Sequence, residues 1–211
     1  MYASQVGEQQ LTFFVSGKLW GHSLVMGDQE TGGSWSHILG QCMEGKLKGE
    51  RLTILPASIT TWSAWAELHP STTATMLKPT ALEFDKHYLS QSKRFCLGLV
   101  HKGKSRSWRF DRLQQHDAPV NDSLADLKLV VHFEQDDQAA VAWSRDVDGR
   151  TLTFEKIENG FVDKETGSTW DLLKGLATDG ELEGKRLEAT SAIASFSNAW
   201  ERFHPEATSW E

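Results

Sequence analysis

Two distant stretches of this chain carry nearly the same motif: residues 28–35 read DQETGGSW, and residues 163–170 read DKETGSTW. Outward from these stretches, the similarity runs without a gap over residues 28–70 and 163–205, at a constant offset of 135. Of these 43 aligned positions 16 are identical, whereas chance gives about one in twenty. Self-similarity at a fixed offset indicates a duplicated unit, so we expect the chain to contain one module twice.

The repeated residues predict β-hairpins. An Asp that opens a turn can accept bonds from backbone N–H groups, and a Gly that closes it can adopt a positive φ. Glycines at 45 and 49 in the first copy, and at 180 and 184 in the second, indicate a further turn. Strands are predicted at 51–55, 95–101, 105–110, 127–134, 139–145 and 151–156, and a helical turn at 111–116.

Each copy ends in a short helix pattern, in which a hydroxyl residue precedes apolar residues at helical spacing and a proline stops the helix. The predicted N-caps and stops are Thr60 or Thr61 with Pro70, and Ser195 or Ser197 with Pro205. We therefore predict an α+β fold of mainly antiparallel β meanders with one short helix per copy. The duplicated halves are expected to be related by a pseudo-twofold axis.

The repeat also predicts the domain boundaries. Leu11-Thr12-Phe13 matches Leu152-Thr153-Phe154 at an offset of 141 rather than 135, so the first copy holds six extra residues before its DQETG turn. The second copy continues upstream to about residue 95, whereas the first cannot. We predict an N-terminally truncated first repeat at 1–77, a linker at 78–94 and a more complete second repeat at 95–211.

Charge and composition argue against several classes of protein. The 211 residues carry a formal net charge of −7, whereas nucleic-acid binding needs a basic face. Cys42 and Cys96 are the only cysteines and are far apart, which argues against a disulfide framework or a structural zinc site. No run of 18 apolar residues and no signal peptide is present, so we expect no membrane span and a cytoplasmic location.

The motifs together resemble a bacterial family known as domain of unknown function 3179. The resemblance over about residues 3–77 is carried by the segments 16–20, 24–26, 28–32 and 45–49 together with Trp35, Gly40, Leu52, Trp62, Trp65 and His69-Pro70. A weaker resemblance covers 95–205 and includes Val120-Asn121-Asp122. The family brings no established activity, and the Cys-Pro-Leu-Cys segment of many members has no counterpart at His132–Asp136.

Residues that both copies keep are interpreted as scaffold, because a duplicated fold needs its turns twice. Carboxylates at 28 and 30, and at 163 and 165, could bind calcium or act as acid and base, but turn capping explains them more simply. His69 and His204 fit a helix C-terminus before proline. The paired tryptophans, Trp35 with Trp170 and Trp65 with Trp200, favour core packing over a sugar platform.

Differences between the copies point to a site, because a site needs polar and reactive groups that a scaffold does not. The first copy alone has the extra segment, and it has His37, Cys42 and Trp62 where the second has Leu172, Ala177 and Ser197. The candidate binding residues are Ser16, Lys18, Trp20, His22, His37 and Cys42, with drift after duplication as the alternative.

We expect an uncharacterised duplicated binding module for a small molecule or another protein, with its pocket in the first repeat. One alternative is a metal- or thiol-dependent enzyme that uses His22, His37 and Cys42, and another is a structural or assembly protein. The sequence does not identify a cofactor, a metal site, a catalytic residue or an oligomeric state. Whether the protein is an enzyme therefore stays open.

Overall fold

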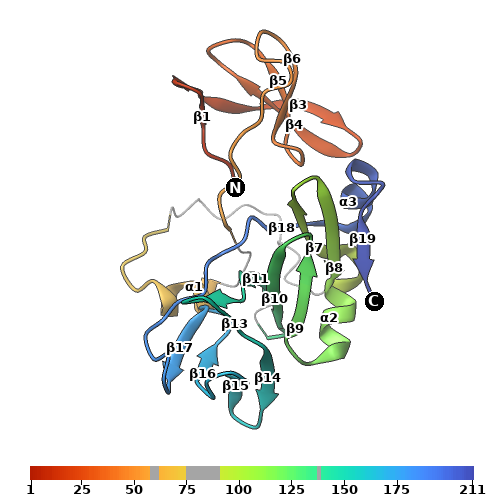
Figure 1. Ribbon diagram of the computed structural model, residues 1–211. Helices are drawn as coiled ribbons and strands as arrows, with labels where there is room; N and C mark the ends of the chain where they lie inside the picture. The colour runs from red at the N-terminus through yellow and green to blue at the C-terminus, as the bar shows by residue number, and fades with distance from the viewer. Residues whose placement is uncertain (58–61, 75–90, 137–138) are drawn as a thin grey trace, which may run out of the picture.

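The computed structural model describes residues 1–57, 62–74, 91–136 and 139–211. Antiparallel sheets dominate, with three short helices in the described part of the chain, so the fold is α+β as predicted. Two four-stranded meanders lie at opposite ends of the molecule, and a third β-rich unit lies between them (Figure 1).

The first meander follows a small hairpin of β1 (Gln5–Val6) and β2 (Gln9–Gln10). Its strands are β3 (Phe13–Trp20), β4 (Ser23–Asp28), β5 (Ser34–Ser36) and β6 (Gln41–Glu44), hydrogen-bonded in chain order. Its core is small and is built around the fully buried Trp35, with Leu11, Cys42 and Leu52. Helix α1 (Trp62–Leu68) comes after this meander.

The second meander has the same strand order, β14 (Phe154–Ile157), β15 (Gly160–Asp163), β16 (Thr169–Asp171) and β17 (Leu176–Asp179). A hairpin of β12 (Asp146–Val147) and β13 (Arg150–Thr151) precedes it, turning at Asp148-Gly149 as predicted. Trp170 is the central aromatic residue of its core, which confirms the core prediction for Trp35 and Trp170.

The central unit contains two sheets around the largest core. One is β11 (Ala139–Ser144), β10 (Leu127–Glu134) and β9 (Val120–Leu124). The other is β18 (Ile193–Phe196), β7 (Phe95–His101), β8 (Lys104–Arg109) and β19 (Thr208–Trp210), with β19 parallel to β8. Two helices, α2 (Phe110–His116) and α3 (Ser197–Phe203), and a 3-10 turn η1 (Ser92–Arg94) complete it.

Several local predictions need correction. The predicted strand at 51–55 forms only isolated bridges, because the chain passes from pairing with Gln41 to pairing with Tyr2 within a few residues. The predicted strand at 151–156 is interrupted, since the backbone N–H of Leu152 bonds to Arg145 and that of Thr153 to Glu165. The predicted linker at 78–94 falls mostly on residues 75–90, outside the described residues, as does the N-cap at Thr60 or Thr61.

The two helices that follow the meanders differ in their surroundings. Trp200 of α3 packs over Gly98 of β7 and is buried, whereas Trp65 of α1 is 38% exposed. Core packing is therefore confirmed for Trp200 and wrong for Trp65, which borders a cavity of about 380 Å³ together with residues 140–143 of β11. The predicted hydroxyl cap of α3 is also wrong, because the extended backbone of Phe196 at the end of β18 leads directly into the helix.

The six extra residues lengthen the β3–β4 hairpin, and a bulge interrupts its register between Val15 and Lys18. The lengthened tip reaches α3 (Figure 1). There the Trp20 and Phe203 rings meet edge to face, with their centroids 4.9 Å apart. Gly21 lies so close to Arg202 that an added Cβ would stand 2.9 Å from its Nε. The insertion therefore joins the first meander to the central unit.

Candidate ligand cavity

The six residues predicted from the first copy do not gather in one pocket. Ser16 supports the bulge, donating to the Val25 carbonyl and accepting from the Lys18 N–H, while the Lys18 side chain is exposed. Cys42 is buried in the core of the meander, and burial raises the pKa of its thiol. This argues against Cys42 as a nucleophile, because the thiolate is the reactive form.

The two predicted histidines line different cavities. His37 borders a cavity of about 150 Å³ beside Tyr2, whose hydroxyl lies 2.6 Å from the His37 carbonyl oxygen. Burial lowers the pKa of the His37 imidazole. His22 sits at the hairpin tip with a positive φ of 65° and lines a separate cavity of about 530 Å³. In the described residues, no group of three or more His, Cys, Asp or Glu side chains is arranged to hold a metal ion.

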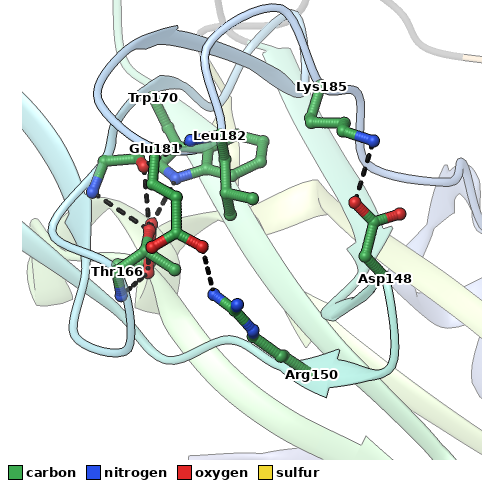
Figure 2. Close-up of polar contacts among 9 residues, drawn as sticks. Asp148, Arg150, Thr166, Trp170, Glu181, Leu182 and Lys185 are labelled. Carbon is green, nitrogen blue, oxygen red and sulfur yellow. Dashed lines mark hydrogen bonds and ion pairs between the residues drawn. The ribbon is translucent and has the colours of Figure 1, made fainter.

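The paired carboxylates cap turns, as the sequence favoured. Asp28 accepts bonds from the Trp35 indole at 2.9 Å and from Thr31, and Asp163 accepts the same bonds from Trp170 and Thr166. Figure 2 shows this network in the second meander, beside the ion pairs Arg150–Glu181 and Asp148–Lys185. The carboxyl groups of Glu30 and Glu165 bond to the backbone at Thr12 and Thr153.

The rings of His69 and His204 each pack against the tryptophan four residues earlier, tilted by 37° with centroid distances of 4.0 and 4.1 Å. Each also donates its backbone N–H to that tryptophan's carbonyl at 2.9 Å. The two histidines therefore finish their helices, in agreement with the structural interpretation made from the sequence.

The cavity beside His22 is the strongest candidate site, because three cationic side chains border it: Lys93, Arg94 and Arg109. The sheet register explains why they converge. Lys93 and Arg94 lie in η1 directly before β7, and Cys96 of β7 pairs with Arg109 at the end of β8. The cations thus meet at one edge of the sheet although they are distant in sequence.

Two of these cations are held in place. Arg109 donates to Asp111 at 3.0 and 3.2 Å and to the Lys93 carbonyl at 3.3 Å. The hydrogen bond with Asp111 raises the pKa of the guanidinium. Arg94 donates to Gln91 at 2.8 Å, and its guanidinium carbon stands 5.4 Å from the centre of the Phe196 ring. A cation fixed before binding loses less side-chain entropy when a ligand arrives.

Helix α3 contributes Ser197, Asn198 and Glu201 to the lining of the same cavity. Ser197 is 8% exposed, and its hydroxyl is bonded to no nitrogen or oxygen atom of the described residues. Beneath it lies Cys96, and burial raises the pKa of that thiol to about 12. The cavity therefore combines fixed positive charge, a buried hydroxyl that lacks a strong partner, and one carboxylate.

Sequence reasoning found only His22 of these lining residues. Lys93 and Arg94 fell in the predicted linker at 78–94. In the alignment of the two similar segments, Ser197 and Glu201 stand opposite Trp62 and Ala66. A search for polar residues that occur only in the second of these segments would have identified Ser197 and Glu201.

No helix in the described part of the chain is long and apolar enough to cross a membrane. A family model matches residues 1–207, and its description reads "Protein of unknown function (DUF3179)". The family resemblance drawn from the sequence is thereby confirmed. No curated protein and no solved structure matches the chain.

Proposed function

The chain belongs to the DUF3179 family of proteins of unknown function, and because that description assigns no activity, we propose from the cavity alone that the protein binds a small anionic molecule. The ligand's carboxylate or phosphate group lies among Lys93, Arg94 and Arg109. The pocket thus lies between the β3–β4 hairpin tip and the central unit, rather than inside the first repeat.

The observation that carries this proposal is the gathering of three cations around one cavity in a chain whose net charge is −7. Arginine binds carboxylate and phosphate groups through charge-assisted hydrogen bonds in fixed geometry. The volume of about 530 Å³ lies in the range of roughly 300–1,000 Å³ usual for small-molecule sites. Ser197 can complete its hydrogen bonding on the same ligand.

The equivalent turn networks support the further proposal that residues 28–70 and 163–205 arose by duplication. Trp35 bonds to Asp28 and Trp170 to Asp163 at the same 2.9 Å, within meanders of the same strand order. On this proposal the insertion in the first copy acquired a new role, because it alone carries His22 to the cavity.

Calorimetric titration of the whole chain with inorganic phosphate, benzoate and citrate tests anion binding. We expect saturable binding of at least one anion, weakened about fivefold by Lys93→Ala, since an exposed charge contributes up to about 1 kcal/mol. Lys48→Ala removes an equal charge from the turn at residues 45–49 and should leave the affinity unchanged. Binding to none of the three anions, or equal weakening by both variants, would contradict the proposal.

Self-assembly is a second candidate function, favoured by the exposed edge strand β3. Val15 and Leu19 are 72% and 70% exposed on this edge, and an open apolar edge can pair with another chain. Self-assembly would be supported by a molecular mass in light scattering that rises with protein concentration. The Val15→Lys variant should then show the mass of a single chain. A constant single-chain mass would exclude it.

A further inference from the structure

The cavity that we propose for an anion also contains a carboxylate, that of Glu201. No Lys, Arg or His nitrogen of the described residues lies within ion-pair distance of it. The negative charge of Glu201 nevertheless acts on two neighbouring groups, because it contributes to raising the pKa values of the Arg109 guanidinium and the Cys96 thiol. A simple anion would bind against this negative charge.

The position of Glu201 on α3 is specific. Ser197 and Glu201 are four residues apart, so they lie one above the other on the same face of the helix. That face borders the cavity, whereas the cations belong to η1 and to the end of β8. The positive groups and the carboxylate therefore come from different elements of the fold.

Resting on the proposed anion site, we infer that the ligand is a zwitterion of the α-amino-acid type. Its carboxylate lies among Lys93, Arg94 and Arg109, and its ammonium group lies at Glu201. The second independent observation is Ser197, which borders the cavity and is more than nine-tenths buried. Its hydroxyl has no nitrogen or oxygen partner among the described residues, and only the Cys96 thiol lies within hydrogen-bonding reach. As donor and acceptor, it can bond to either end of such a ligand.

This assignment makes Glu201 a specificity residue. An acid without an amino group leaves the Glu201 carboxylate unpaired beside a second negative charge, whereas an amine without a carboxylate faces three cations. Discrimination of this kind rests on the unfavourable charge pairs met by the wrong ligand as much as on the contacts of the right one.

Isothermal titration of the whole chain with matched ligand pairs tests the inference. The pairs are L-leucine with 4-methylpentanoate, L-phenylalanine with 3-phenylpropanoate, and L-glutamate with glutarate, each differing only in the amino group. We expect at least one amino acid to bind tenfold or more tightly than its partner acid. Glu201→Gln should remove this ratio by weakening the amino acid and not the acid.

Glu183→Gln, an exposed substitution on the second meander with the same change of charge, is the control and should preserve the ratio. Equal affinities within every pair, or a ratio that survives Glu201→Gln, overturn the zwitterion assignment and leave the anion site standing. If neither the amino acids nor the acids bind, the proposed function falls together with this inference.

Discussion

Replacing Gly98 with Ala tests the packing of Trp200 on β7, which distinguishes helix α3 from helix α1. The added Cβ would lie 2.6 Å from Cδ2 of Trp200, closer than real Cβ contacts, and the backbone of β7 cannot move without disturbing both neighbouring strands. Trp200 is 1% exposed and packs against the His204 ring, so its own ring has little freedom to turn away. The adjoining cavity of about 140 Å³ permits a small shift. We therefore expect a loss of about 1–3 kcal/mol in unfolding free energy, as for other overpacked sites.

Gly27→Ala is the matched control. Its Cβ would lie 2.8 Å from Cε1 of Phe14, a comparable clash, but Phe14 is 47% exposed and can swing into solvent. Both glycines have backbone conformations open to alanine, so the gain from a less flexible unfolded chain is similar in the two variants. The difference between the two changes in unfolding free energy therefore measures how much it matters that the aromatic ring can move.

Urea unfolding and thermal melts measure the effect. For a chain of this size, about 1–3 kcal/mol corresponds to a fall in Tm of roughly 2–12 °C. Gly98→Ala should lower Tm by this amount, while Gly27→Ala should change the free energy by less than about 1 kcal/mol. Equal losses in the two variants, or a larger loss for Gly27→Ala, would refute the argument from burial.

Three further predictions concern titratable groups that are buried or half-buried. The Asp28 carboxyl is buried, which by itself would raise its pKa, but bonds from Trp35, Thr31 and Gly33 hold the pKa below its usual value. The ionised Asp28 carboxylate therefore stabilises the folded chain fully above about pH 4, and this stabilisation is lost as the pH falls through the folded-state pKa. Asp28→Asn should lower the unfolding free energy by about 1–3 kcal/mol at pH 7 and should flatten the fall in stability at acid pH, as measured by urea titrations. Because burial raises the Cys96 pKa to about 12, iodoacetamide at pH 8 should label it at least about a hundredfold more slowly in the native than in the urea-unfolded chain, and equal labelling rates by mass spectrometry would contradict this. Burial, and then the charge of Arg51, lower the His204 pKa, so the unfolded chain binds the proton more readily and stability should fall as the pH drops below about 6.5; His204→Gln should remove this slope, and an NMR titration that places the pKa at or above the ordinary value would disprove it.

The two similar turn motifs and several strands could be predicted from the sequence, because they depend on neighbouring residues. The strand predicted at 127–134 has those limits in the structure, and the hairpin around Lys102-Gly103 forms as expected. The Asp28 and Asp163 turns are closed by residues only three to seven positions away. Such short-range hydrogen bonding leaves a local signature.

The candidate cavity left no such signature. Lys93, Arg109 and Glu201 come together only through the pairing of β7 with β8 and the docking of α3, which join segments up to about a hundred residues apart. The residues predicted from the first copy were chosen by chemical type, and only His22 proved to lie on this cavity, because the length of its hairpin carries it there.

By itself, the sequence determined that the chain has two similar meanders with capped turns, since hydrophobic alternation and Asp-to-Gly turn chemistry act over a few residues. Only the tertiary structure decided that Trp200 is buried while Trp65, in the same local motif, is exposed. It also decided which charges face one cavity. Burial and electrostatics depend on what packs against a segment, and that partner is specified by strand pairing between distant parts of the chain rather than by the segment's own residues.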